Sequence, residues 1–400
     1  MSLREESGRD VMPQSTLHED VTAARVAAEV GQVSTPRNSG PRHVPSLDGL
    51  RTPAVVAVML FHVGFPYARP LGALGVDLFF VLSGFLITTL LIREHERRGQ
   101  IHLVRFWGRR FLRLMPAYYT YAAFITLAIL VFGWGTTATA RVNGWSVDDL
   151  VVSIWFYFVN YAPISGLWSN PNWIVHLWSL AVEEQFYLIW PPVLGFALKC
   201  KRGALIGWVL VAAIAINRVF YGDWERAHWL DARGLGIMLG CAVALSLRGP
   251  TASRARQVIG QSWVRFASIA GVVALGAISM MVGRVVGESY DLSLYTEPAF
   301  DLCFAALVAS LYHGPADPVS RSLSIRSVVY LGKISDGIYL YHMICQAVVW
   351  DVKIAALDAL PRGPRYLVRL AMFVGLSVGM ASLSYHFLER PFLSLKERFR

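Results

Sequence analysis

The feature that most constrains this chain is a succession of apolar stretches, each long enough to cross a lipid bilayer. Apolar residues make up 55% of the 400 residues and charged residues only 16%, whereas a soluble domain carries about a quarter charged residues. So few charges cannot cover so much apolar surface in water. The sequence therefore predicts an all-α, polytopic membrane protein and excludes a cytosolic globular enzyme, a disordered scaffold and a secreted disulfide protein. The candidate spans lie at about 47–66, 72–92, 116–134, 176–198, 203–221, 229–247, 264–283, 299–313, 328–352 and 366–389.

The distribution of basic residues predicts the topology, because loops retained in the cytoplasm gather Arg and Lys. Residues 93–113 hold seven arginines and are expected in the cytoplasm, which places the N-terminus there too. The later basic clusters fall on the same side if an eleventh stretch, Val147 to Ala162, is not a full crossing. The result is about ten transmembrane helices with both termini cytoplasmic. Lys353, Arg362 and Arg365 are the exception, since they land outside. This topology also explains the net charge of +10, so no nucleic acid partner is inferred.

Three regions follow from this pattern. Residues 1–45 form a polar tail with mixed charges and several Pro, Gly and Ser, which predicts a disordered cytoplasmic segment without a signal peptide. Residues 46–393 form the membrane domain, and residues 394–400 form a short basic cytoplasmic tail. The four cysteines are scattered singly in or beside apolar runs, so their spacing predicts neither a metal site nor a redox pair.

Ionisable residues within a span are costly, so each one is a candidate functional residue. The first span carries Arg51 and His62, which are eleven residues apart and therefore share one helix face, roughly 16 Å apart along the axis. An arginine is suited to binding a phosphate or carboxylate, and a neutral imidazole to taking a proton from a hydroxyl. The alternative is that Arg51 anchors the helix at the membrane surface and that His62 is a packed, hydrogen-bonded histidine.

The second span carries Asp77, a carboxylate that needs a partner. It could orient His62 or pair with an arginine. In the same span, Ser83 lacks the Gly-x-Ser-x-Gly context of a serine hydrolase, so we interpret Ser83 and Gly84 as small residues that pack between helices.

The fourth span contains His176, Glu183 and Glu184. His176 and Glu183 are seven residues apart and share a helix face. The two adjacent glutamates point about 100° apart, so at most one of them can address the same point as His176. Two consecutive glutamates in an apolar helix indicate a functional site, although a structural salt-bridge network is the alternative.

Further charged residues lie in or beside the remaining spans. Asp231 and Arg233 could pair with each other or with neighbours, and Asp336 and His342 share the ninth span. Glu389 and Arg390 lie at the cytoplasmic interface, where a structural role is the better interpretation. Arg110 and Arg113 belong to the basic segment, which is chiefly a topology signal but could also meet nucleotide phosphates.

Six segments together resemble the acyltransferase-3 family of integral-membrane O-acyltransferases. They occur in the family's order across about 46–393 and read SLDGLRTPAVVAVMLFH, GVDLFFVLSGFLI, FWGRRFLRLMPAYY, HLWSLAVEEQFY, ISDGIYLYH and SYHFLERP. The resemblance implies ten transmembrane helices and transfer of an acyl group, often acetyl, from a cytoplasmic acyl-CoA to a hydroxyl of a carbohydrate or natural product. The family's Arg-ten-residues-His signature maps onto Arg51 and His62, and its glutamate onto Glu183.

The chain departs from the family pattern at three points. Thr52 and Pro53 follow Arg51 where glycine is usual, and Asp336 stands where most relatives carry tyrosine. Many relatives also carry a C-terminal extramembrane domain, and none is expected here. The chain is therefore similar to the stand-alone branch, which includes enzymes that modify macrolide antibiotics as well as surface glycans.

The resulting hypothesis is a cavity among the first, second and fourth spans in which His62 acts as general base on the acceptor hydroxyl. Asp77 or Glu183 would orient His62 and stabilise its imidazolium form. No metal or organic cofactor is signalled, apart from acyl-CoA as co-substrate, and direct transfer and a covalent acyl-enzyme both stay open. The substrate-binding candidates are Arg51, Glu184, His176, Arg110, Arg113, Asp231, Arg233 and His342.

Two other classes of function fit the same features. A transporter or flippase for a glycan or small molecule would also need many spans with buried charges, but it predicts two related halves, and no such symmetry is present in the sequence. A non-catalytic membrane partner that recruits an enzyme would tolerate substitution of Arg51, His62 and Glu183.

Overall fold

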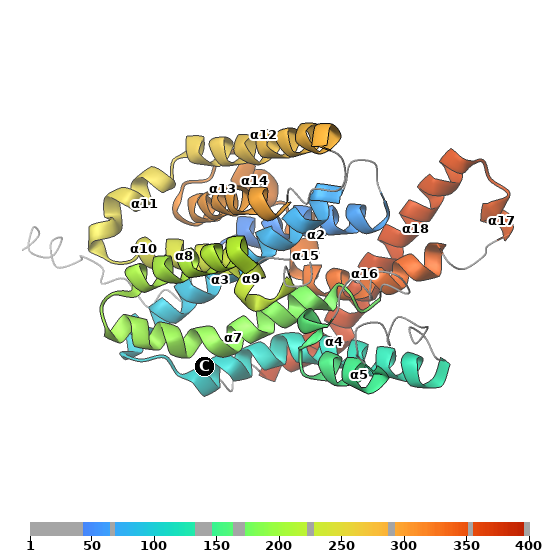
Figure 1. Cartoon of the computed structure of the whole chain (residues 1–400), viewed down its shortest axis with the longest axis horizontal. Coiled ribbons are helices and arrows are strands. Elements are labelled where there is room, and N and C mark those ends of the chain that lie inside the picture. Colours follow the sequence, from blue (N-terminus) through green and yellow to red (C-terminus); the bar gives the residue numbers. More distant parts are fainter. Residues whose placement is uncertain are drawn as a thin grey trace, which may run out of the picture. The chain divides into compact units, whose positions relative to one another are not determined.

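The computed structural model describes residues 43–64, 69–132, 146–162, 173–221, 228–286, 293–350 and 355–395. Every regular element in these ranges is a helix, which confirms the all-α class (Figure 1). The chain divides into residues 1–43 and a second unit, 44–400, which is the unit described below. The predicted disordered tail therefore falls almost wholly outside the described residues, as does most of the predicted basic tail at 394–400.

Four helices meet at the centre of the second unit: α2 (Pro45–His62), α3 (Arg69–Arg98), α10 (Leu235–Ser246) and α13 (Ser293–His313). Glycines let α3 and α10 approach closely. A Cβ on Gly84 would lie 1.9 Å from the Ile237 carbonyl oxygen, and one on Gly240 would lie 2.3 Å from the Val81 carbonyl oxygen. Each helix therefore presents a glycine to the other's backbone, which confirms the packing role predicted for Gly84.

The other helices surround this centre. The bounds are α4 (Leu103–Phe132), α5 (Val147–Trp155), α7 (Leu177–Lys199), α8 (Gly203–Tyr221), α9 (Leu230–Arg233), α11 (Ser253–Ile259), α12 (Ser262–Val286), α14 (Pro318–Leu323), α15 (Arg326–Lys333), α16 (Ser335–Trp350), α17 (Ala355–Asp358), α18 (Arg362–Leu383) and α19 (Arg390–Ser394). Short 3₁₀ turns lie at η2 (Val159–Tyr161) and η4 (Pro250–Ala252), and a π-helical turn at η5 (Ser384–Glu389).

Within the described residues, five helical stretches are long and apolar enough to cross a membrane, and they correspond to α3, α4, α8, α12 and α18 with its extension. A sixth arises if α10 and the segment Pro250–Ile259 count as one span, although these two parts are bent by 103°. These helices confirm a membrane protein. The count of ten spans and the cytoplasmic termini stay predictions.

Several predicted spans are shorter or interrupted. The span predicted at 229–247 is α9 followed by α10, and that at 328–352 is α15 followed by α16. The ambiguous stretch at 147–162 begins with α5, whose nine residues are about 13 Å long. Because a bilayer core is about 30 Å thick, α5 alone cannot cross it, in agreement with the interpretation that this stretch is not a full crossing.

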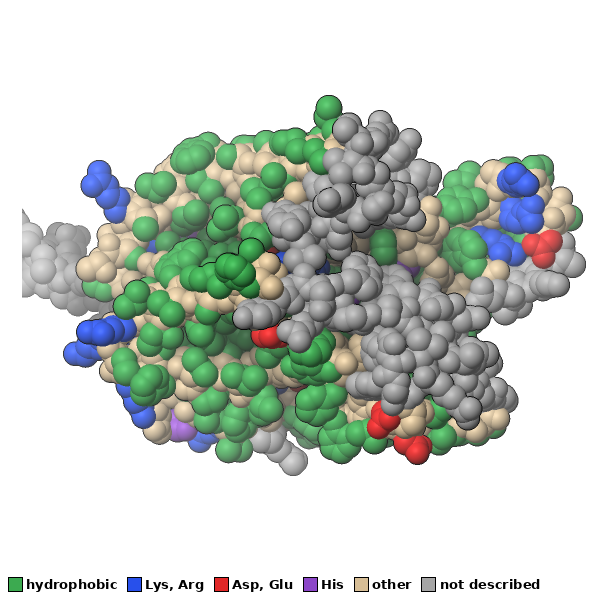
Figure 2. All heavy atoms as spheres, viewed as in Figure 1, with side chains coloured by type: hydrophobic (Ala, Val, Ile, Leu, Met, Phe, Trp, Pro, Cys, Tyr) green, Lys and Arg blue, Asp and Glu red, His purple; other side chains and the backbone are tan. Residues whose placement is uncertain are grey.

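Burial separates central helices from lipid-facing ones. In α3, 78% of the most apolar window is buried inside the protein, whereas the share is 17% in both α8 and α12. Figure 2 shows hydrophobic side chains over much of the described surface, with Lys and Arg along the left edge and over α18 at the right. An apolar surface of this extent is expected where helices face lipid.

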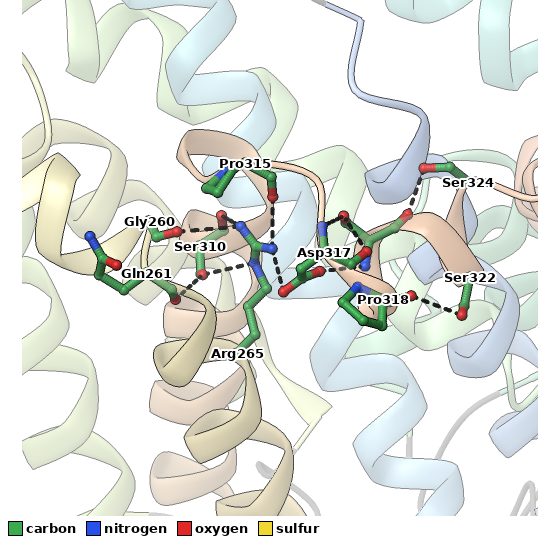
Figure 3. Close-up of polar contacts among 10 residues, drawn as sticks. Gly260, Gln261, Arg265, Ser310, Pro315, Asp317, Pro318, Ser322 and Ser324 are labelled. Carbon is green, nitrogen blue, oxygen red and sulfur yellow. Dashed lines mark hydrogen bonds and ion pairs between the residues drawn. The ribbon is translucent and has the colours of Figure 1, made fainter.

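A buried arginine joins α12 to the connection between α13 and α14 (Figure 3). Arg265 is fully buried and donates hydrogen bonds to the carbonyl oxygens of Pro315 and Ser310 at 2.9 and 3.1 Å. It also forms an ion pair with Asp317 at 2.6 Å. Burial by itself raises the pKa of Asp317, but the hydrogen bond from the Ser320 backbone and the contact with Arg265 outweigh it, so this pKa lies below its usual value.

Candidate functional site

The imidazole of His62 lies at the C-terminal end of α2 and is fixed through one ring nitrogen. Its Nδ1 is 2.9 Å from the Val58 carbonyl oxygen, one turn earlier in the same helix, and 3.2 Å from Nε2 of His342 in α16. The two histidine rings meet edge to face, with their centroids 4.8 Å apart. Gln346, one turn beyond His342, donates to the backbone oxygen of His62. Two helices that are distant in sequence therefore hold His62.

The hydrogen-bond chain determines which nitrogens carry protons. Nδ1 of His342 is 2.5 Å from the Tyr339 carbonyl oxygen, which can only accept, so this nitrogen carries the hydrogen. In a neutral ring, Nε2 of His342 is then an acceptor. Nδ1 of His62 accordingly donates to His342 and to Val58. The other nitrogen of His62, Nε2, is left with its lone pair and can take a proton.

A third histidine completes this cluster. His176, immediately before α7, has its ring centroid 5.3 Å from that of His342, and its Nε2 is 3.1 Å from the Leu340 carbonyl oxygen. The Tyr339 hydroxyl is 2.6 Å from the Ser179 hydroxyl and 3.0 Å from the His176 carbonyl oxygen. The structure thus brings His62, His176 and His342 together, as the sequence could not show.

The predicted phosphate-binding arginines gather around Asp336, at the start of α16. Its two carboxylate oxygens form ion pairs with Arg51 of α2 and Arg113 of α4, each at 3.1 Å. Arg110, one turn before Arg113, lies over the Tyr187 ring at 5.0 Å from its centroid. Three guanidinium groups and one carboxylate therefore meet where α2, α4, α7 and α16 come together. The sequence singled out Asp336, but it did not predict that Asp336 pairs with these arginines.

Glu183 is held by hydroxyl groups. Ser83 of α3 and Tyr187, one turn further along α7, both donate hydrogen bonds to Oε1 of Glu183, and the two hydroxyl oxygens are 3.2 Å apart. Glu183 makes no ion pair with a described residue, so the structure does not support the predicted alternative of a salt-bridge network. Ser83, interpreted as a packing residue, also has this polar role. The i, i+4 spacing of Glu183 and Tyr187 was the signal in the sequence that could have identified the tyrosine.

The predicted contact between His62 and a carboxylate is not found among the described residues. Glu183 is occupied by Ser83 and Tyr187, and Asp77 pairs with Arg233 at 2.9 Å. Arg233 also pairs with Glu297, which pairs in turn with Arg218. Of the two partners predicted for Asp77, the structure therefore gives the arginine. Asp231 does not pair with Arg233 and instead accepts a hydrogen bond from Asn217 at 3.1 Å.

Two pockets lie against the first half of α16. One, of about 410 Å³ and partly open to the outside, lies between α4, α7, α16 and the π-helical turn, and Arg113, Glu184, Asp336 and Glu389 are its charged lining residues. The other, of about 310 Å³, lies between α3, α7 and α16, and it is lined mainly by apolar side chains together with Ser179, Asp336 and Tyr339. Both include Leu180 and Asp336.

These two pockets differ in location from the cavity that the sequence predicts. The sequence placed it among the first, second and fourth spans, but α16 lines both pockets and α2 lines neither. Helix α2 is covered by α3, α15 and α16, with Arg51 in its second turn and His62 at its C-terminal end. Glu184 faces the larger pocket and makes no hydrogen bond or ion pair with a described residue.

Comparisons with known proteins agree on one family. A family model described as an acyltransferase domain, acyltransferase-3, matches residues 44–387. The peptidoglycan O-acetyltransferase OatA of Listeria monocytogenes is 31% identical over 373 residues, which cover 88% of this chain and 56% of that protein. The O-acetyltransferase OatA of Staphylococcus aureus is 30% identical over 361 residues, which cover 88% of this chain and 57% of that protein. The chain thus spans somewhat more than half the length of these relatives. No solved structure matches it.

Proposed function

Because the chain belongs to the acyltransferase-3 family, we propose that it is an integral-membrane O-acyltransferase that transfers an acetyl group from acetyl-CoA to a hydroxyl of a glycan. The similarity to two proteins named O-acetyltransferases supports the acetyl group, and the name of one of them, a peptidoglycan O-acetyltransferase, supports the glycan. The apolar helices α3, α4, α8, α12 and α18, which are long enough to cross a bilayer, support a location in the membrane.

The observation that carries the proposal is the fixed tautomer of His62. Its Nδ1 hydrogen is bound to the Val58 carbonyl oxygen and to His342, so Nε2 has a free lone pair. A general base needs this arrangement: one nitrogen held, the other open to the proton it takes. A histidine that served packing alone would also have its N–H bound, but both hydrogen bonds of the His62 ring to described residues are made by Nδ1 and none by Nε2.

The reaction follows from this base. His62 Nε2 takes the proton of the acceptor hydroxyl as its oxygen forms a bond to the thioester carbonyl carbon. The tetrahedral intermediate collapses when the carbon–sulfur bond breaks, and the CoA thiolate takes the proton back from the His62 imidazolium. The products are an ester and free CoA, and the histidine returns to its neutral form. No covalent acyl-enzyme is needed. Holding the two substrates in line supplies much of the rate enhancement.

The donor's phosphates would meet the guanidinium groups of Arg51, Arg110 and Arg113. Arginine suits this task because its planar fork matches phosphate oxygens. The three side chains come from two helices that converge on α16. The apolar pocket between α3, α7 and α16 shares Asp336 with these arginines, which places it beside the uncharged arm of a donor bound there.

The test uses membranes that contain wild-type protein, His62→Ala or His386→Ala, incubated with acetyl-CoA labelled in its acetyl group. His386 is an exposed histidine of the π-helical turn and serves as the matched control. We expect a base-labile labelled ester with wild type and His386→Ala, and a reduction of about a hundredfold or more with His62→Ala. The labelled fraction, whether glycan, lipid or small molecule, identifies the acceptor class. Equal labelling with all three proteins would remove His62 from the mechanism, and the absence of any labelled ester would favour a transporter.

A further inference from the structure

The carboxylate of Asp336 lies between two of the arginines that we propose as ligands of the donor's phosphates. Its two oxygens each bind a different guanidinium group, one from Arg51 and one from Arg113, both at 3.1 Å. A phosphate that bridged the same two arginines would place two of its oxygens in the same way. The carboxylate therefore fills the anion site between these two arginines.

The surroundings of Asp336 allow it to be displaced. Its side chain is 28% exposed and that of Arg113 is 33% exposed, in contrast to the pair of Arg265 and Asp317, which are 0% and 7% exposed. Asp336 also lines both pockets beside α16. A ligand in either pocket can thus reach the ion pairs, and a partly exposed pair is worth less than a fully buried one, so an anion of higher charge can replace it.

The charge balance has a direct consequence for affinity. Asp336 neutralises one of the three positive charges contributed by Arg51, Arg110 and Arg113. Arg110 makes no ion pair with a described residue and lies instead over the Tyr187 ring. A donor that carries several phosphate charges must therefore displace the carboxylate and also tolerate its repulsion.

We propose that Asp336 is a built-in competitor for the donor's phosphate site, which holds the affinity for acyl-CoA below what the three arginines would otherwise give. This inference rests on the proposed function, because it takes acyl-CoA as the donor. It assigns to Asp336 control of donor affinity, and it predicts that loss of this one charge strengthens donor binding.

The test measures binding of CoA to the purified full-length protein in detergent by calorimetry, at low and at high salt. The variants are Asp336→Asn, which removes the charge and keeps the shape, and Asp336→Glu, which keeps the charge. Glu94→Gln is the matched control. It removes one negative charge from the ion pair between Glu94 and Arg109, and the predicted topology places this pair on the same side of the membrane as Asp336. We expect Asp336→Asn to bind CoA about threefold to tenfold more tightly at low salt, with a smaller gain at high salt. Asp336→Glu and Glu94→Gln should stay within about twofold of wild type.

Each other outcome has a distinct meaning. Weaker or unchanged CoA binding by Asp336→Asn would overturn the inference, since the carboxylate would then organise the arginines rather than compete with the donor. If wild type and all variants fail to bind CoA, the proposed donor is wrong and the inference falls with it. If Asp336→Asn does not survive purification, the same comparison with labelled CoA in unextracted membranes, repeated with Asp336→Ser, decides between these outcomes.

Discussion

At the scale of single residues, the decisive contact is the one between two histidines from opposite ends of the sequence. His342 offers Nε2 to His62 because its own Nδ1 is bound to the Tyr339 carbonyl oxygen. The backbone of α16 therefore sets the tautomer of His342, and His342 sets that of His62. A carboxylate holds the histidine in many general-base pairs, whereas here a neutral imidazole does so in a largely apolar setting.

This arrangement predicts the effect of changing His342. In His342→Leu, His62 loses an acceptor for its Nδ1 hydrogen, so kcat should fall by about tenfold to a hundredfold while KM changes little. In His342→Gln, the amide oxygen can replace Nε2 as acceptor and should restore part of kcat. The measurement is steady-state acetyl transfer by the two variants, with thermal unfolding as the control for folding. Equal kcat values for Leu and Gln would show that His342 acts through packing alone.

The sequence predicted candidate site residues but not the partners that they have in the structure. Arg51, His62 and Glu183 were selected from their positions in apolar helices, because an ionisable residue within a membrane span is energetically costly and is therefore a functional candidate. Their partners lie on other helices: His342 and Asp336 on α16, and Ser83 on α3. Spacing along one helix reveals which side chains share a face, but it does not reveal which face of another helix meets them. Asp77 was for that reason left with two possible partners.

At the scale of helices, close packing depends on positions without a side chain. Gly84 of α3 faces the backbone of α10, where an added Cβ would lie 1.9 Å from the Ile237 carbonyl oxygen. Backbone atoms cannot yield as a flexible side chain would, so the helices must separate to admit even one methyl group. Because Ser83 binds Glu183, displacement of α3 would also disturb the candidate site.

We therefore expect Gly84→Ala to destabilise the protein by about 1–3 kcal/mol. Gly276→Ala in α12 is the control, since nothing lies within 4 Å of the added Cβ there and alanine favours a helix more than glycine does. Thermal unfolding in detergent measures both variants. If Gly84→Ala unfolds at the same temperature as Gly276→Ala, the contact between α3 and α10 is looser than the structure indicates.

At the scale of the whole molecule, the ten spans predicted from the sequence outnumber the helices that are long and apolar enough to cross a membrane within the described residues. Helices α2 and α16, of 18 and 16 residues, carry ionisable residues, because other helices pack around them. The outer helices α8 and α12 are apolar and largely exposed. Hydropathy and length recognise the buried helix α3 as well as the lipid-facing helices α8 and α12, while α2 and α16, which hold the candidate site, depend on their neighbours for burial.

The pair of Arg265 and Asp317 connects these layers and predicts how stability depends on pH. The pKa of Asp317 is lower in the folded protein than its usual value, which is about 3.9 in an unfolded chain. The pair therefore stabilises the fold fully above that value, and this contribution is lost as the pH falls through the lowered pKa of the folded state.

Thermal unfolding of wild type between pH 7 and pH 3 should show this loss at the acidic end. Asp317→Asn should be less stable by about 3–5 kcal/mol at pH 7, because it leaves the charge of the fully buried Arg265 without its partner. The difference between the two proteins should shrink as the pH falls below about 3.9, since the unfolded wild-type chain then binds a proton at Asp317 more readily than the folded protein does. A difference that stays constant across this range would mean that hydrogen bonds to Asp317, rather than its charge, hold α12 to the connection between α13 and α14.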